Sequence, residues 1–443
     1  MQRGTSALWR LTLSELVQGV REGRHSCVDV MRAHLARCAA KEPAVQAWEH
    51  LDGDRAMTAA EASDARLASG AEARELEGVP LGIKDIIDVA GMPTRMGSRI
   101  MAGNVAHVTA ECVARLEAAG AIVVGKTVTT EFAYYTPGKT RNPWNSAHTP
   151  GGSSSGSAAG VACGMIAGAL GTQTNGSVIR PAAFCGVVGY KPSYGAVANH
   201  GTLDPWPSLD HTGVFARTVT DAAMLAGVIM QSGISAGIDP IAAPRLAAVR
   251  SPVWALADPV QKDAFARAVE RLRAAGADVS ERELPPSFAD AHAAMRTIMA
   301  YEACVHFAKL RADRAEDMSS QLRALIDEGA GIEDGAYRAA LLLQETLRAE
   351  FADYMVSFDA LITPPAPGEA PATLEQTGSP AFCTIWSLLG VPAITVPVDL
   401  GPHGLPLGLQ IVAAYREESA ALAVACWCEQ TFAFTGLTTR ESP

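Results

Sequence analysis

The sequence lacks the features that identify several large classes of proteins. Its nine cysteines are odd in number, scattered and without metal-ligand spacing, so we expect neither a metal site nor a disulfide framework. Leu8-Trp9-Arg10 leads directly into a capped helical pattern, where a secretory signal would have an apolar run. The net charge of −11 argues against nucleic acid or an anionic membrane as a partner. We therefore expect reduced thiols and a cytoplasmic protein.

Common motifs for nucleophiles and phosphates are absent as well. There is no Gly-x-Ser-x-Gly elbow, and none of the ten histidines has a sequence context that marks it as a base. Gly151 and Gly156 have the separation of a phosphate-binding loop, but Ser157 stands where the lysine of that loop would follow. A reactive serine in this chain would therefore need a base other than histidine.

The sequence does contain two Gly/Ser-rich turns, in the segment GGSSSGSAAGVACGMIAGALGTQTNGSVIRP at 151–181. Glycines let backbone N–H groups approach a bound atom, and consecutive N–H groups form a nest for an anion. The second turn ends in Ser177, so one segment can offer both a nucleophile and donors for an oxyanion. A flexible linker is the alternative interpretation. The uncharged run from Ala158 to Leu170 argues against it, because that run predicts a buried helix, too short to span a bilayer.

Lys84 is the candidate base. Lysine can act as a base where burial or neighbouring charge lowers its pKa and the neutral amine becomes populated. Lys84 lies in the apolar segment 79–89, where an ammonium group is poorly placed. The alternative is an ordinary lysine that reaches solvent or pairs with Asp85.

Segments 78–85, 151–181 and 404–410 together resemble the amidase signature family of serine amidohydrolases. The resemblance implies a Ser-cisSer-Lys triad with Ser177 as nucleophile, Ser153 as bridging serine and Lys84 as base. Neutral Lys84 would take a proton from Ser153, which relays it from Ser177 during attack on a carbonyl carbon. Water would then clear the acyl-enzyme. The resemblance also implies a cis Gly152–Ser153 peptide and no metal or organic cofactor.

The resemblance assigns the oxyanion hole to backbone N–H groups of Thr174, Asn175, Gly176 and Ser177. Two positions depart from the commonest family pattern, which has Gly at position 175 and Asp at position 173. Asn is the non-glycine residue that best tolerates positive φ, so we expect the turn to survive. Gln173 is similar to the form found in malonamidase-like small-amide hydrolases, and we interpret it as the marker of a branch.

Four further residues are candidates for contact with a substrate: Tyr134, Ser154, Arg180 and Trp206. Arg180 follows the nucleophile by three residues and could bind a carboxylate bidentately, although a structural role is the first interpretation. Tyr134 precedes the first turn in the region that lines the family's pocket, and Trp206 is a second candidate wall.

The resemblance implies a single α/β domain over 1–443, with a central mixed β-sheet flanked by helices on both faces. Helix, glycine and strand patterns alternate near 111–125 and 264–279, which independently favours this architecture. We expect a helical N-terminal layer at 1–70, a core with the catalytic residues at 71–235, a mostly helical peripheral layer at 284–360 and a C-terminal part of the core at 361–443.

Three classes of function stay open. The first is a free-standing hydrolase of carboxamide C–N bonds, in which aryl acylamides or carbamates (urethanes) are further small-molecule substrates of the same triad. The second is the glutaminase subunit of a tRNA-dependent amidotransferase, although Gln173 and Asn175 depart from its usual Asp and Gly. The third is a non-catalytic binding relative, which the intact triad disfavours. By family habit we also expect a homodimer.

Overall fold

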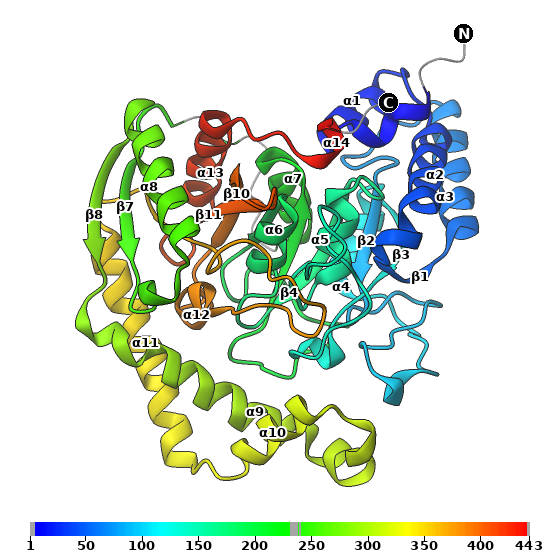
Figure 1. Cartoon of the computed structure of the whole chain (residues 1–443). Coiled ribbons are helices and arrows are strands. Elements are labelled where there is room, and N and C mark those ends of the chain that lie inside the picture. The colour runs from blue at the N-terminus through cyan, green and yellow to red at the C-terminus, as the bar shows by residue number, and fades with distance from the viewer. Residues whose placement is uncertain (1–4, 231–237, 239–240, 441–443) are drawn as a thin grey trace.

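The computed structural model describes residues 5–230, 238 and 241–440 (Figure 1). These residues form one sheet of 11 strands in the order β1-β3-β2-β4-β6-β5-β10-β11-β9-β7-β8. The strands are β1 Trp48–Leu51, β2 Pro80–Lys84, β3 Ile122–Thr127, β4 Gly168–Gln173, β5 Val188–Lys191, β6 His211–Ala216, β7 Arg245–Arg250, β8 Asp278–Glu283, β9 Ala360–Thr363, β10 Ala393–Leu400 and β11 Pro406–Val412.

Parallel and antiparallel pairs both occur in this sheet. Strand β2 runs parallel to its neighbours β3 and β4, and β7 runs parallel to β8 and β9. The strands between them, from β6 through β11, pair antiparallel. The predicted mixed sheet is therefore confirmed, and the parallel pair of β2 and β4 brings their carboxyl ends to the same edge.

Helices flank the sheet on both faces, as predicted. They are α1 Leu13–Arg21, α2 Cys27–Val45, α3 Gly53–Ala68, α4 Glu111–Ala118, α5 Ser155–Ala162, α6 Ile179–Cys185, α7 Val219–Ile229, α8 Pro259–Ala274, α9 Ala291–Arg314, α10 Ser320–Gly329, α11 Asp334–Met355, α12 Ala381–Leu388, α13 Glu418–Phe432 and α14 Leu437–Arg440. Short 3₁₀ turns cover Thr5–Arg10, Arg99–Met101, Glu131–Ala133, Trp254–Leu256, Pro286–Asp290 and Ala315–Asp317. None of the described helices has the length and apolar character needed to cross a bilayer.

The predicted helix over Ala158–Leu170 is wrong in its second half. Helix α5 ends at Ala162, and Gly164 then takes a left-handed φ of 75° that turns the chain back. The remainder enters β4, which lies between β2 and β6 and is buried along its whole length. A strand buried on both faces shows no alternation of polar and apolar residues, so the sequence pattern could not distinguish it from a buried helix.

Helices α9, α10 and α11 fill most of the range 284–360 and stand apart from the sheet at the lower left of Figure 1. Their apolar faces form a second core with residues from other parts of the chain. Phe307 of α9, for example, packs on Phe132 with ring centroids 5.3 Å apart, and Phe351 of α11 packs on Trp386 of α12 at 5.6 Å. This helical layer therefore adjoins the segments that follow β3 and precede β10.

Two glycines in α5, Gly156 and Gly160, allow a test by substitution of how tightly this helix packs on the sheet. A methyl group at Gly156 would lie 2.2 Å from the carbonyl oxygen of Ala47 and 2.4 Å from the backbone nitrogen of Val128. We expect Gly156→Ala to lower the free energy of unfolding by about 1–3 kcal/mol, because backbone atoms must move apart. Urea unfolding measures this change.

Gly160 is the matched control on the same helix. A methyl group there would meet only the side-chain tip of Ile166 at 3.2 Å, which can turn aside. We expect Gly160→Ala to stay within about 1 kcal/mol of the wild type, because alanine also favours the helix. Equal losses in both variants would contradict this account of the packing.

Candidate active site

The carboxyl ends of β2 and β4 bring Lys84 close to two hydroxyl groups. Lys84 is the last residue of β2, and its Nζ donates hydrogen bonds to Ser153 Oγ at 2.6 Å and to Thr172 Oγ1 at 2.7 Å. Ser153 lies in the turn before α5, and Thr172 lies near the end of β4. The parallel pairing of β2 and β4 thus brings in Thr172, 88 residues from Lys84 in the sequence, and the turn before α5 brings in Ser153, 69 residues away.

Burial changes the chemistry of this amine. The side chain of Lys84 is fully buried, and desolvation lowers its pKa from 10.5 to about 7, while the charge of Asp210 acts in the opposite direction. No described carboxylate forms an ion pair with Lys84. Asp85 pairs instead with the buried Lys126, at 3.1 Å. The alternative interpretation of Lys84, in which it reaches solvent or pairs with Asp85, is therefore excluded.

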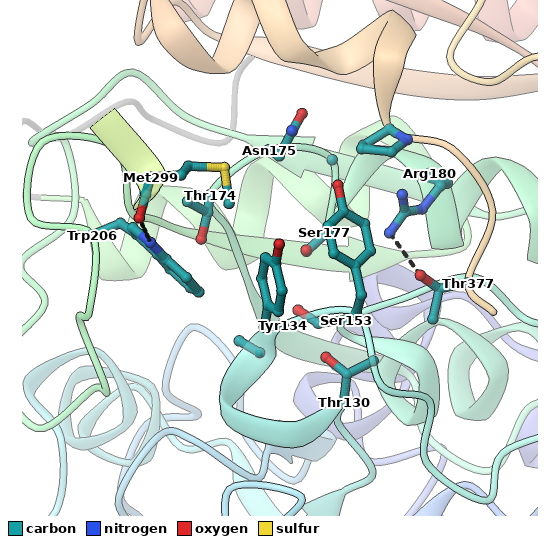
Figure 2. Close-up of a pocket in the computed structure, with 14 residues that line it drawn as sticks. Thr130, Tyr134, Ser153, Thr174, Asn175, Ser177, Arg180, Trp206, Met299 and Thr377 are labelled. Atoms are coloured by element: carbon teal, nitrogen blue, oxygen red, sulfur yellow. Dashed lines mark hydrogen bonds between the residues drawn. The ribbon is translucent and has the colours of Figure 1, made fainter. Parts of the chain in front are cut away.

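Beside Lys84 lies a small cavity. Figure 2 shows Ser153 and Ser177 with their hydroxyl groups directed into it. Its lining residues are Thr130, Ala133, Tyr134, Tyr135, Ser153, Thr174, Asn175, Gly176, Ser177, Arg180, Trp206, Met299, Thr377 and Pro380. No direct hydrogen bond joins the hydroxyls of Ser153 and Ser177, although both line this cavity.

The turn between β4 and α6 presents backbone donors to the same cavity. No described residue accepts a hydrogen bond from the N–H of Thr174, Asn175, Gly176 or Ser177. Consecutive N–H groups without a protein acceptor beside a cavity suit the binding of an anionic oxygen. Neither Asn175 nor Gly176 has positive φ, so the expected reason for the survival of the turn is wrong: Asn175 causes no backbone strain there.

The side chains of Gln173 and Asn175 both have partners outside the turn. Gln173 Oε1 accepts from the backbone N–H groups of Val178 and Ile179 at 2.8 and 3.0 Å, and its Nε2 donates to Ser387 Oγ at 2.9 Å. Asn175 Oδ1 accepts from Thr384 Oγ1 at 2.8 Å. Gln173 therefore satisfies the amino-terminal end of α6, at the position where the commonest family pattern has Asp.

Arg180 lines the cavity while its guanidinium group holds two loops together. It donates to the carbonyl oxygen of Gly152 at 2.7 Å and to that of Gly378 at 2.8 Å, and to Thr377 Oγ1 at 3.2 Å. Burial lowers its pKa, and no described carboxylate pairs with it. The Gly152–Ser153 peptide, whose carbonyl it binds, is cis.

Tyr134 and Trp206, the two aromatic candidates for substrate contact, form one wall of the cavity. Ser154, another candidate, does not line it. Tyr134 and Trp206 have ring centroids 6.0 Å apart. Tyr134 Oη accepts from Arg296 at 2.9 Å, and Trp206 Nε1 donates to the carbonyl oxygen of Met299 at 2.9 Å, so α9 holds both rings. The prediction that Ser154 contacts a substrate needs correction, because its hydroxyl faces away from the cavity.

Ser154 instead completes the hydrogen bonds of β4. Its Oγ donates to the carbonyl oxygen of Thr172 and accepts from the N–H of the same residue, both at 3.3 Å. It is fully buried and does not line the cavity. The three consecutive serines of the first turn thus have different surroundings, which their sequence does not distinguish.

Several residues of the site have no signal in the sequence. Thr172 and Asp210 are examples: the first binds Lys84, and the second accepts hydrogen bonds from Thr174 Oγ1 and from the N–H of Trp206. Met299 reaches the cavity from α9. These residues are single polar or apolar positions in ordinary patterns, so only the folded chain brings them to the site. Within the described part of the chain, no group of three or more His, Cys, Asp or Glu residues could hold a metal ion.

Comparison with known proteins agrees with this geometry. A family model described as Amidase matches residues 29–422. The chain is 36% identical over 463 residues to the A subunit of glutamyl-tRNA(Gln) amidotransferase from Acidothermus cellulolyticus, with 92% of both chains covered. It is also similar to the solved structure of a peptide amidase from Stenotrophomonas maltophilia, with 28% identity, a TM-score of 0.85, and 98% of this chain and 99% of that chain covered.

A further solved structure belongs to a vestigial protein complex that reveals the evolutionary origins of an s-triazine catabolic enzyme. The identity is 29% and the TM-score 0.88, over 96% of this chain and 100% of that chain. Fold, site and relatives together define the class as serine amidohydrolases that act on C–N bonds. Within that class, the chain belongs to the amidase family, in its amidase signature form.

The lowered pKa of Lys84 gives a prediction that needs no knowledge of the substrate. If the neutral amine activates the serines, the rate at which a small sulfonyl fluoride modifies Ser177 should rise with pH around a midpoint near 7. Intact-mass spectrometry over a pH series measures the rate. In Lys84→Met we expect a rate about 10²–10⁴-fold lower at high pH, without this midpoint.

Lys191 provides a matched control for this experiment. It is also fully buried with its pKa lowered to about 7, but its Nζ donates to the carbonyl oxygen of Val391 at 2.6 Å and it does not line the cavity. We expect Lys191→Met to keep the midpoint near 7. A midpoint that disappears in Lys191→Met and persists in Lys84→Met would contradict the role of Lys84.

Proposed function

We propose that this protein is a serine amidohydrolase that cleaves carboxamide C–N bonds through an acyl-enzyme on Ser177. The observation that carries the proposal is the buried amine of Lys84, hydrogen-bonded to Ser153 beside the cavity that Ser177 also lines. With a pKa of about 7, a large fraction of this amine is neutral at physiological pH and can accept a proton. Lys84 differs from the equally buried Lys191 in that its hydrogen-bond partner, Ser153, lines the cavity.

The reaction follows from this arrangement. As Ser177 Oγ forms a bond to the substrate carbonyl carbon, its proton passes to Ser153 Oγ and the proton of Ser153 passes to Lys84 Nζ. The carbonyl oxygen becomes an oxyanion, which the N–H groups of the turn Thr174, Asn175, Gly176 and Ser177 bind. The relay then runs backwards: the leaving nitrogen takes a proton from Ser153 as the C–N bond breaks.

Water completes the cycle. It attacks the acyl-enzyme carbonyl, gives a proton to the same Ser153–Lys84 pair, and releases the acid as Ser177 regains its proton. No metal or organic cofactor takes part in this scheme. A carbamate fits it as well, because its acyl-enzyme would lose carbon dioxide and alcohol after hydrolysis.

The cavity favours small substrates with an apolar part. Tyr134, Trp206 and Met299 supply an apolar wall, as is usual for sites that bind small organic molecules. An aliphatic or aryl carboxamide fits this wall, and an aryl acylamide or carbamate is the alternative substrate of the same site. An acidic substrate would require the Arg180 guanidinium to bind a carboxylate in addition to its present backbone acceptors.

A second candidate function is the glutaminase subunit of a tRNA-dependent amidotransferase. Sequence relatives favour it, since the similar protein of Acidothermus cellulolyticus carries that name and is covered over 92% of its length. The complex to which another similar chain belongs also supports a protein partner. A homodimer is the partner expected for a free-standing amidase. The non-catalytic alternative stays disfavoured, because Lys84, Ser153 and Ser177 are all present.

A substrate panel tests these alternatives. It contains an aliphatic amide, an aryl acylamide, a carboxylate-bearing amide, an aryl carbamate and glutamine, with release of ammonia or amine as the measurement. We expect the wild-type protein alone to hydrolyse at least one small amide or carbamate. Ser177→Ala should lower that rate by about 10⁴-fold or more, with an unchanged melting temperature.

The outcomes separate the candidates. Preference for the carboxylate-bearing amide would assign Arg180 to the substrate, and preference for the carbamate would define a urethanase. Hydrolysis of glutamine alone, and only after the partner proteins of an amidotransferase are added, would favour the second candidate function. If the wild-type protein is folded but no more active than Ser177→Ala, with or without those partners, catalysis by Ser177 is excluded.

A further inference from the structure

Helix α12 lies directly against the turn that presents the N–H groups of the proposed oxyanion hole. Pro380, the residue before α12, lines the cavity, and a methyl group added to Gly176 would lie 3.0 Å from its Cβ. Thr384 and Ser387 are three residues apart on α12 and therefore share one face. Both are buried, and both direct their hydroxyl groups at Asn175.

The direction of each hydrogen bond in this contact is determined by the donors available. Ser387 has one hydroxyl proton, and it donates to the carbonyl oxygen of Asn175, which can only accept. The lone pairs of Ser387 then accept from Gln173 Nε2 at 2.9 Å. This orientation leaves Gln173 Oε1 toward the N–H groups of Val178 and Ile179, which can only donate. The hydrogen bonds from Gln173 through Ser387 to the Asn175 carbonyl thus all run in one direction.

This chain of hydrogen bonds fixes the orientation of the peptide group that contributes the Gly176 N–H. The peptide between Asn175 and Gly176 is trans, so its C=O and N–H point in opposite directions. A carbonyl held by Ser387 on the α12 side keeps the N–H of Gly176 directed away from α12. Hydrogen bonds in series also polarise one another, which makes that N–H a stronger donor.

The other side of α12 is held by the peripheral helices, so it forms a rigid support. Gln344 of α11 donates to the carbonyl oxygen of Leu388 at 2.8 Å, and the carbonyl oxygen of Ala381 is 3.0 Å from His292 Nε2 of α9. Groups that hold a catalytic geometry are most effective on elements fixed in this way.

We propose that Ser387, with Thr384 as its neighbour, is a positioning residue for the oxyanion hole, acting through the hydrogen-bond chain Gln173–Ser387–Asn175. The role rests on the proposed function of Ser177. It also accounts for one departure from the commonest family pattern: a neutral amide at Gln173 leaves the Ser387 proton to the Asn175 carbonyl, whereas a carboxylate at that position would compete for it.

Steady-state kinetics of Ser387→Ala on the best substrate of the panel test this role. We expect kcat to fall by about 10- to 100-fold, less than for loss of an oxyanion donor itself, with KM changed by less than about threefold. In Thr384→Val, which loses the bond to Asn175 Oδ1, we expect a smaller fall in kcat, and Thr384→Ser should restore it. An equal loss of kcat in Thr384→Ser and Thr384→Val would overturn the role of the Thr384 hydroxyl.

Gln173→Glu supplies a readout that a merely structural role would not change. An ionised carboxylate at 173 accepts the Ser387 proton, whereas a protonated one donates as the amide does. We therefore expect the ratio of kcat for Gln173→Glu to wild-type kcat to rise as the pH falls. In addition, the infrared carbonyl stretch of the acyl-enzyme should move to higher frequency in Ser387→Ala, because a weaker oxyanion hole polarises the carbonyl less.

Thr395→Val is the matched control. Thr395 is also a buried hydroxyl that donates to a backbone carbonyl, that of Leu409 at 3.1 Å, but it lies in β10 and does not line the cavity. Its kcat should equal that of the wild type. An active wild type with unchanged kcat and carbonyl stretch in Ser387→Ala overturns the role of Ser387 alone. A wild type that never acylates Ser177 overturns the proposed function and this role together.

Discussion

The burial of one amine without a counter-ion is the constraint on which this site depends. Lys84 stands at the end of β2 with Ser153 and Thr172 as its hydrogen-bond partners, and no described carboxylate pairs with it. Water would stabilise the charged form of a lysine by several kcal/mol, so the fold must exclude water and place neutral oxygens around Nζ to keep the amine available. The parallel pairing of β2 and β4 brings Lys84 and Thr172 to one sheet edge, and the turn before α5 places Ser153 beside them.

The surroundings of that amine are also mostly neutral. The oxyanion turn is held by amides and hydroxyls, from Gln173 and Asn175 to Ser387, and Asp85 is paired with Lys126 away from the cavity. A negative charge close to the turn would oppose the oxyanion that forms there, and would raise the pKa of Lys84. Asp210 is the exception: its charge acts on Lys84, while burial raises its own pKa well above the usual range.

Much of the fold was predictable from local patterns, and the errors have identifiable physical causes. The capped helical pattern after Leu8-Trp9-Arg10 forms α1, with Thr12 and Glu15 as its capping box. Helices and strands also follow the predicted alternation around 111–125 and 264–279. The helix predicted over 158–170 was wrong in its second half, because a strand buried on both faces and a buried helix have the same apolar composition. We expected Asn175 to be accepted in its turn because Asn tolerates positive φ, but that expectation was wrong, because the φ of Asn175 is not positive.

The sequence by itself determined the residue types that a serine amidohydrolase needs, because Lys84, Ser153 and Ser177 lie in recognisable local segments. It also determined the Gly-rich turns, whose conformations depend on neighbouring residues. Tertiary structure alone decided that Lys84 is buried beside Thr172, that Ser154 faces away from the cavity, and that Met299 and Ser387 reach the site from distant helices. Those outcomes depend on strand pairing and helix packing between segments far apart in the chain, which no local pattern of residues encodes.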